Sequence, residues 1–232
     1  MKTKLTVKEI NEKYIREKSK LDGFPPPTTT EDEITIQKFY SDHPELNRTK
    51  QVVGTGSTAY RVNEPWIQTY TGKRFSPTNP IPDSIVIEDI AHALSMICRY
   101  TGHSSKFYSV AEHSVLVSYL GDPKYGLLHD ASEAYICDIA SPIKKLPEFE
   151  TYRYIERNLQ KIIYNKFGLN NDMPESTKKA DLLMLSTEAH YLMSDIKDWE
   201  LDYKPLPFIP KCLSPYEAEQ LFLLRYHELF DE

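Results

Sequence analysis

The sequence of 232 residues has no long apolar run, and its N-terminus lacks the apolar core of a signal peptide. A helix that crosses a membrane needs about 18 or more consecutive apolar residues, and no stretch approaches that length. These absences exclude the usual membrane-spanning and secreted classes. We therefore expect a cytoplasmic protein with no membrane partner.

Paired cysteines and an excess of basic residues are also missing. Cys98, Cys137 and Cys212 are odd in number and widely spaced, so we expect reduced thiols rather than disulfides. The chain has 28 Lys and Arg against 34 Asp and Glu, a net charge of −6. A protein that binds nucleic acid generally carries a basic surface, so we expect no nucleic-acid partner.

The pattern along the chain predicts two parts. Residues 1–60 read as an N-terminal extension with a helix over 5–20, a proline-rich break over 24–29 and a second helix over 30–42. Residues 61–232 read as the main domain, with a small β-hairpin at its start.

Helical periodicity dominates the main domain, and strands do not alternate with helices. The fold class that we predict is therefore all-α, a helical bundle with a small hairpin and a helical extension. The predicted helices cover Glu88 to Tyr100, a segment from Ser109, 127–138, 148–167, a segment from Pro174, and Ser214 to about Phe230. Capping boxes are predicted at Ser109 with Glu112 and at Ser214 with Glu217, and Gly168 is predicted to end the helix 148–167.

The adjacent pair His129-Asp130 lies in the predicted helix 127–138. An imidazole and a carboxylate together suit a divalent metal. Glu133 would lie one turn further on the same face, where it could orient or activate a water. An isolated His-Asp dipeptide also arises by chance. In that case the histidine would be an ordinary hydrogen-bonded helix residue and the aspartate would be exposed to solvent.

Two further residues extend the candidate site. His113 lies early on the preceding helix, and a short turn lets the two helices pack antiparallel. Asp181 interrupts an apolar stretch, where a carboxylate is costly unless it is exposed, paired or bound to a cation. Four protein ligands would leave positions for water and substrate on one divalent ion, either Mn, Co, Zn or Mg.

Five segments carry a resemblance to a known family: CRY over 98–100, SVAEHS over 109–114, HDASE over 129–133, CDIASPIK over 137–144 and KAD over 179–181. In this order they resemble the HD-domain metal-dependent phosphohydrolase superfamily. The likeness is greatest to bacterial 5′-deoxynucleotidases and to phage and bacterial nucleotide phosphohydrolases, including phage dATP triphosphohydrolases.

This resemblance implies a helical HD-domain bundle over 61–232 and, by analogy, a homo-oligomer. It implies that four residues hold the metal: His113, His129, Asp130 and Asp181. It also implies that Glu133 orients or deprotonates the attacking water, that Arg99 binds the phosphate being cleaved, and that Asp138 reaches the sugar 3′-hydroxyl. Tyr100 occupies the position where the deoxynucleotidases usually have a Trp that crowds the ribose 2′ position. A smaller ring there leaves strict selectivity for deoxyribose open.

Two weaker candidates for substrate binding are His103, in a loop near Arg99, and Arg74, in the hairpin. For each, an ordinary solvated loop residue is the default interpretation. No histidine lies between Asp130 and Asp181, and two-metal members of the superfamily have extra histidines there. The sequence therefore favours a site for one metal ion.

Three functions remain open at the level of sequence. The first is a metal-dependent phosphohydrolase, in which a metal-activated water attacks a deoxynucleoside 5′-monophosphate or triphosphate. The second is hydrolysis of an alarmone of the ppGpp type. The third is a non-catalytic interaction protein on the same bundle, with residues 1–60 as its working part.

Overall fold

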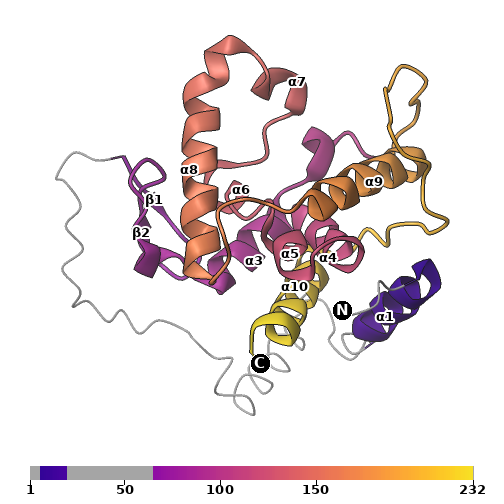
Figure 1. The fold of residues 1–232 in the computed structure, drawn as a ribbon, viewed down its shortest axis with the longest axis horizontal. Helices are drawn as coiled ribbons and strands as arrows, with labels where there is room; N and C mark the ends of the chain where they lie inside the picture. The colour runs from indigo at the N-terminus through magenta and orange to yellow at the C-terminus, as the bar shows by residue number, and fades with distance from the viewer. Residues whose placement is uncertain (1–5, 20–64, 232) are drawn as a thin grey trace, which may run out of the picture.

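The computed structural model describes residues 6–19 and 65–231 (Figure 1). The helix predicted over 30–42 lies outside these residues. The helices are α1 Val7–Ser19, α3 Ile87–Met96, α4 Val110–Leu120, α5 Pro123–Leu128, α6 Glu133–Ile136, α7 Ser141–Lys144, α8 Glu150–Lys166, α9 Glu175–Leu192 and α10 Pro215–Phe230. Short 3₁₀ turns are η1 Pro82–Ser84, η2 Arg99–Gly102 and η3 Pro147–Phe149, and the strands are β1 Ile67–Gln68 and β2 Arg74–Phe75. The predicted all-α fold with a small hairpin is confirmed.

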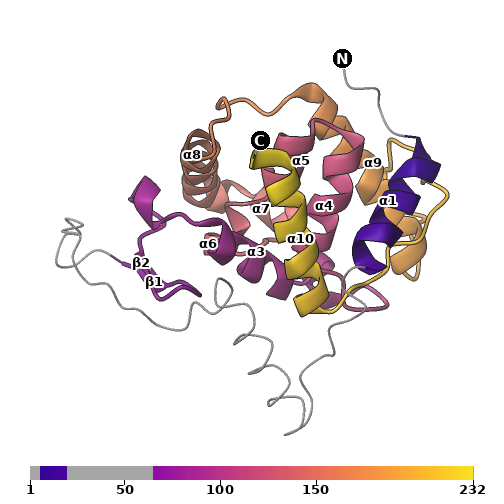
Figure 2. The same ribbon diagram turned by 90° about the horizontal axis from the view of Figure 1, so that it is seen from below.

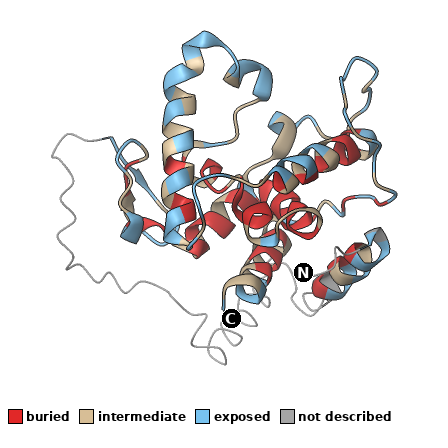
Figure 3. Cartoon of the chain, in the orientation of Figure 1, coloured by how far each residue is buried: buried red, intermediate tan, exposed pale blue. Residues whose placement is uncertain are grey.

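Helix α4 forms the centre of the bundle. Its residues from Val110 to Tyr119 are all buried, and it packs against α3, α5, α9 and α10. A helix that is covered on every side needs no polar face, which explains why its sequence shows little amphipathic pattern. Figure 3 shows this buried centre, whereas α7 has no buried residue and α8 buries only Leu159, Ile163 and Tyr164.

Two glycines allow the helices to approach α4 closely. A Cβ on Gly126 of α5 would lie 2.7 Å from Ser118 Cα on α4. A Cβ on Gly121 would lie 2.9 Å from Thr177 Cα on α9. Both distances are too short for a real side chain, so these glycines set the separation of the three helices that surround the candidate site.

Helix α1 packs against the main bundle near α10 (Figure 2). Ile10 and Tyr14 are buried within the same apolar core as α4 and α10. The Tyr14 hydroxyl donates a 2.6 Å hydrogen bond to the carboxylate of Glu112 on α4. The first helix of the extension is therefore part of the packed structure, while the boundary predicted near residue 60 stays a prediction.

The capping box predicted at Ser109 is only half right. Ser109 Oγ accepts a hydrogen bond from Glu112 N, as an N-cap should. The Glu112 side chain does not return to the Ser109 backbone. It instead accepts hydrogen bonds from Tyr14 and from the backbone N–H groups of residues 211–213.

The hairpin is confirmed, with Ile67 opposite Phe75 in an antiparallel pair. Phe75 is fully buried and stacks on Tyr135 of α6 at a centroid distance of 4.0 Å. The hairpin turn is also tied to α3, because Thr71 N donates to Asp89 Oδ1 at 2.7 Å. These contacts hold the hairpin against α3 and α6.

Helix α3 ends at Met96, earlier than the predicted end near Tyr100. Beyond it, Cys98 pairs with Ser109 in an isolated β-bridge, and Arg99 N donates to Tyr108 O at 2.9 Å. The chain then passes through three residues with positive φ, at Tyr100, Thr101 and Gly102. This extended pairing replaces the last helical turn and sets the position of Arg99.

The single helix predicted over 127–138 is wrong, because α5 ends at Leu128 and α6 begins at Glu133. In a continuous helix Ser132 N would bond to Leu128 O. The side chain of Gln160 from α8 occupies that place instead. Its Nε2 donates to Leu128 O at 2.7 Å, and its Oε1 accepts from Ser132 N at 2.9 Å. The resulting turn carries His129 and Asp130.

Among the helices within residues 6–19 and 65–231, none combines the length and apolar character needed to span a membrane.

Candidate metal centre

Three parts of the bundle bring the predicted ligands together: α4 supplies His113, the turn after α5 supplies His129 and Asp130, and α9 supplies Asp181. His113 Nε2 lies 3.2 Å from His129 Nε2 and 3.1 Å from Asp181 Oδ1. His129 Nε2 lies 3.2 Å from Asp130 Oδ2. We call these four residues the donor cluster.

Three residues of the donor cluster form a group that suits a divalent cation. The ligand atoms of His113, His129 and Asp130 all lie within 4.8 Å of one another, so these three residues could hold a metal ion. Atoms bound at about 2.1 Å to one ion are about 3 Å apart when their bonds are at right angles. The shortest separations between donor atoms, 3.1–3.2 Å, agree with that spacing. Two others are longer, since His113 Nε2 lies 3.8 Å from Asp130 Oδ2 and His129 Nε2 lies 3.8 Å from Asp181 Oδ1.

In both imidazoles the second ring nitrogen, Nδ1, lies within hydrogen-bond distance of an oxygen outside the donor cluster. His129 Nδ1 lies 2.8 Å from the backbone oxygen of Gly126. His113 Nδ1 lies 2.6 Å from Glu188 Oε1. An oxygen at this position requires the proton on Nδ1, which leaves Nε2 of each ring directed into the donor cluster. This arrangement is typical of histidines that bind metals.

The charge of the site also favours a cation. Three buried or partly buried carboxylates oppose a single guanidinium, which leaves a formal charge of −2 when both imidazoles are neutral. The carboxylates are those of Asp130, Asp181 and Glu188, and the guanidinium is that of Arg99. One divalent ion would cancel this charge.

The pKa values of the predicted ligands reflect these neighbours. Burial and Arg99 lower the pKa of His113, but Glu188 and Asp181 outweigh them and raise it to about 9. Burial opposes ionisation of Asp130, yet His129 and His113 hold the pKa of that carboxyl well below its usual value. The donor cluster therefore keeps its carboxylates ionised and its histidines ready to exchange a proton for a cation.

Arg99 lies at the edge of the donor cluster. Its Nη1 is 3.6 Å from Asp130 Oδ2, and its Nε donates to Glu188 Oε2 at 3.1 Å. The side chain is only 12% exposed. Burial lowers the pKa of Arg99, but Glu188 leads the neighbours that reverse this effect and raise it. The guanidinium is thus a fixed positive charge beside the ligands.

Glu133 begins α6 on the other side of Asp130. Burial, followed by the charges of Asp130 and Asp138, raises the pKa of Glu133 well above its usual range. Lys144 of α7 lies 3.7 Å from Glu133 Oε1. Burial, together with the charge of Asp130, likewise raises the pKa of Asp138, while Arg99 and Lys144 oppose this. Both carboxyls therefore lie within electrostatic range of the donor cluster.

Glu188 of α9 is a site residue that the sequence interpretation missed. It is fully buried and contacts both His113 and Arg99. It lies seven residues after Asp181, two helical turns along the same face of α9. This spacing from Asp181 was the sequence feature that could have identified Glu188 as a site residue, but a glutamate on a helix is more often exposed to solvent.

The substrate candidates are placed differently from one another. Tyr100 donates a 2.7 Å hydrogen bond to Glu188 Oε2, and its ring faces Trp199 at a centroid distance of 6.1 Å. His103 is exposed in the turn that follows η2. Arg74 lies over the ring of Trp66, 5.0 Å from its centroid, on the hairpin. Tyr100 thus joins the candidate site through Glu188, whereas His103 lies in an exposed turn and Arg74 lies on the hairpin.

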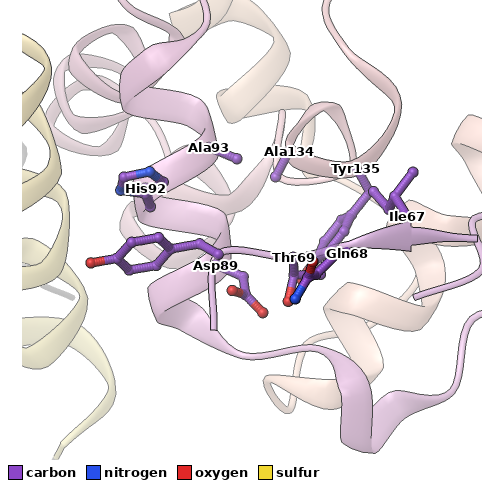
Figure 4. Close-up of a pocket in the computed structure, with 9 residues that line it drawn as sticks. Ile67, Gln68, Thr69, Asp89, His92, Ala93, Ala134 and Tyr135 are labelled. Atoms are coloured by element: carbon purple, nitrogen blue, oxygen red, sulfur yellow. The ribbon is translucent and has the colours of Figure 1, made fainter. Parts of the chain in front are cut away.

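A cavity of about 450 Å³ lies between the hairpin, α3 and α6 (Figure 4). Its walls include Gln68 and Thr69 from the hairpin and Asp89 and His92 from α3. His92 stacks on Tyr70 and bonds Glu219 through Nδ1 at 3.0 Å, as expected for a packing histidine. None of the lining residues belongs to the donor cluster, so this cavity is separate from the candidate metal centre.

No protein-family model matches the sequence. Uncharacterized protein YfdR of Escherichia coli strain K12 is 39% identical over 175 residues, covering 71% of this chain and 95% of YfdR. Uncharacterized protein RCAP_rcc00048 of Rhodobacter capsulatus is 31% identical over 187 residues, with the same coverage of 71% and 95%. On this similarity, the chain belongs to the protein family that includes YfdR and RCAP_rcc00048.

Proposed function

We propose that this chain is a divalent-metal-dependent phosphohydrolase that acts on (deoxy)nucleotides. The observation that carries the proposal is the donor cluster with a fixed guanidinium beside it: Arg99 Nη1 lies 3.6 Å from the ligand atom of Asp130. A cation and an arginine side by side suit an anionic oxygen group such as a phosphate. The resemblance of five sequence segments to HD-domain nucleotidases supports a nucleotide as the substrate.

His113, His129, Asp130 and Asp181 would hold the cation. A divalent ion in this position supplies Lewis-acid stabilisation of the negative charge that develops on a phosphate during its hydrolysis. Asp181 is the most exposed of the four side chains, at 36%. The cluster is therefore open to solvent and substrate mainly on the side of α9.

Arg99 would bind the phosphate. Its Nε is already bonded to Glu188, so the two Nη atoms remain for oxygen atoms of a ligand. A guanidinium can donate to two oxygens at once, and this fixes the orientation of a phosphate more closely than a lysine would. Of the two Nη atoms, Nη1 lies beside the Asp130 carboxylate, so a bound phosphate would be next to the donor cluster.

Glu133 would hold and release the proton of the attacking water. Its raised pKa makes the carboxylate more basic than an exposed glutamate, as a group that accepts a proton near neutral pH requires. No described residue donates to its buried Oε2. The charge of Lys144, whose Nζ lies 3.7 Å from Oε1, limits the increase in the pKa of Glu133.

Asp138 and Tyr100 would contact the sugar. Asp138 follows α6 and is partly buried near Arg99. The Tyr100 ring is fixed through its hydroxyl to Glu188, so its distance from the sugar cannot adjust freely. Because this ring is smaller than indole, we expect the preference for deoxyribose to be weaker than in enzymes with Trp at this position.

The test is product analysis on the purified chain. Preparations loaded with Mn²⁺, Co²⁺, Zn²⁺ or Mg²⁺ are offered each nucleoside and deoxynucleoside mono- and triphosphate, and ppGpp as a separate substrate. Nucleoside and phosphate from monophosphates indicate a 5′-nucleotidase, and nucleoside with triphosphate indicates a triphosphohydrolase. Cleavage of ppGpp alone would replace the proposal with an alarmone hydrolase.

The matched variants are Asp130→Asn and Asp83→Asn. Asp130 is a cluster ligand, whereas the Asp83 side chain is 93% exposed on η1. We expect activity to be lost in the first variant and retained in the second. A metal-loaded wild-type chain that cleaves none of these substrates would contradict the proposal and favour a non-catalytic interaction protein.

A further inference from the structure

The buried carboxylate of Glu188 accepts four hydrogen bonds. Oε1 accepts from Tyr108 Oη at 2.8 Å and from His113 Nδ1 at 2.6 Å. Oε2 accepts from Tyr100 Oη at 2.7 Å and from Arg99 Nε at 3.1 Å. The two oxygens together provide about four lone-pair positions, so the acceptor capacity of Glu188 is filled.

One of these bonds determines how His113 meets the donor cluster. With Nδ1–H donated to Glu188, the neutral ring presents the lone pair of Nε2 to the cluster. Nε2 is the atom that lies 3.1 Å from Asp181 and 3.2 Å from His129. Without Glu188 the ring could carry its proton on either nitrogen and could rotate. The carboxylate therefore selects one tautomer and one ring orientation.

The hydrogen bond from Arg99 to Glu188 determines how the guanidinium is oriented relative to the donor cluster. Glu188 takes Nε, the inner nitrogen, and thereby fixes the plane of the guanidinium. Of the outer nitrogens, Nη1 then lies at the cluster, 3.6 Å from Asp130 Oδ2. A salt bridge that used the outer nitrogens would leave none of them for a ligand.

We propose that Glu188 is a positioning residue that orients His113 toward the cation and Arg99 toward the phosphate through one carboxylate. Its link to the phosphate rests on the proposed function, whereas its link to the cation needs only the donor cluster. Tyr100 and Tyr108 complete the arrangement, because they fill the two remaining lone pairs and prevent Glu188 from rotating.

Glu188→Gln tests the proposal because an amide has one acceptor oxygen, whereas the carboxylate has two. The NH₂ group would face two of the four hydrogen-bond donors around Glu188 and could accept from neither. Co²⁺ is the probe, since its visible absorption reports both affinity and coordination. We expect the Kd for Co²⁺ to rise about 10–100-fold, the usual effect of removing a partner that orients a ligand. We also expect the spectrum of the bound Co²⁺ to change. The exposed Glu148→Gln is the matched control, with no change expected in either quantity.

Glu188→Asp serves if the glutamine variant does not fold. It keeps the buried charge, but it is one methylene shorter and cannot reach both sets of donors. Its Kd for Co²⁺ is expected to rise about tenfold. For the phosphate link, orthophosphate binding to the Co²⁺-saturated chain is expected to weaken by a similar factor in both variants.

The wild-type chain provides a test that depends on no variant. Long-range ¹H–¹⁵N spectra of the Zn²⁺-loaded chain should show His113 protonated at Nδ1. A proton on Nε2, or a folded Glu188→Gln with the wild-type Co²⁺ affinity and spectrum, would overturn the proposal. A chain that binds Co²⁺ in the expected way but hydrolyses no nucleotide would contradict only the proposed function.

Discussion

Replacing Gly126 with alanine should destabilise the protein, although the same change in most helices does the opposite. In an ordinary helix interior, alanine is more favourable than glycine by about 1 kcal/mol. Gly126 of α5 instead faces the backbone of α4. A Cβ there would lie 2.7 Å from Ser118 Cα and 2.8 Å from Ser118 N. Because both atoms belong to the backbone, relief requires the two helices to move apart.

The magnitude follows from two opposing effects. Overpacking of a rigid contact costs about 3 kcal/mol at the upper end of its usual range, and the helix propensity of alanine returns about 1 kcal/mol. We expect a net loss of about 2 kcal/mol in the free energy of unfolding. For a chain of this size that corresponds to a decrease of roughly 4–8 °C in Tm.

The same substitution should weaken metal binding, since the Gly126 carbonyl lies 2.8 Å from His129 Nδ1 and must move with the helix. Urea denaturation followed by circular dichroism measures the stability, and Co²⁺ titration measures the binding. Asn165→Ala, at an exposed position of α8, is the control and should be neutral or slightly stabilising. If Gly126→Ala were as stable as the wild type, our account of the α4–α5 contact would be refuted.

Three further predictions concern pH and the N-terminal helix. Burial raises the pKa of Glu188, but Arg99 and His113 prevail and lower it from 4.5 to about 2. This difference contributes about 3 kcal/mol to the free energy of unfolding, a contribution that is present above about pH 4.5 and lost as the pH falls toward 2. Urea titrations across this range should show the loss in the wild type and not in Glu188→Gln. The pKa of His113 is raised to about 9, so a cation that binds at neutral pH must displace a proton. Calorimetry should therefore find that the Mn²⁺ affinity rises roughly tenfold per pH unit between about pH 7 and 9. An affinity that does not depend on pH would contradict this prediction. Tyr14→Phe removes the hydrogen bond to Glu112 and should lower the free energy of unfolding by about 1 kcal/mol; equal stability of the two proteins would show that this bond does not hold α1 in place.

Local sequence signals were sufficient for several parts of the fold. Ser214 and Glu217 form the predicted capping box at the start of α10. Gly168 has a φ of 71° just beyond α8, where the predicted helix stop requires a left-handed residue. The hairpin also lies where its turn residues indicated. In each case the residues that determine the structure are neighbours in the sequence.

Contacts between distant segments account for the errors. The helix predicted over 127–138 is interrupted by Gln160, which lies about three turns into α8 and replaces a backbone hydrogen bond of that helix. Glu112 leaves its capping box because Tyr14 and the backbone near Leu213 provide buried donors. No periodicity within either segment contains that information.

The candidate site shows the same division. The sequence placed His113, His129, Asp130 and Asp181 in one cluster, since their order and types already suggest a cation site. Glu188 could not be distinguished in the same way, because its importance depends on four donors that come from other segments. Sequence reasoning thus predicts candidate metal ligands more readily than the buried residues that contact them.

The most direct test of the central claim is a titration of the metal-free chain with Mn²⁺, in which bound metal and nucleotide hydrolysis are measured on the same samples. We predict that the rate of hydrolysis of deoxynucleoside mono- or triphosphates rises in proportion to bound Mn²⁺ and levels off at one equivalent. Asp130→Asn should bind Mn²⁺ weakly and hydrolyse neither. Binding of one equivalent without any hydrolysis, or hydrolysis that persists after chelation, would contradict the account.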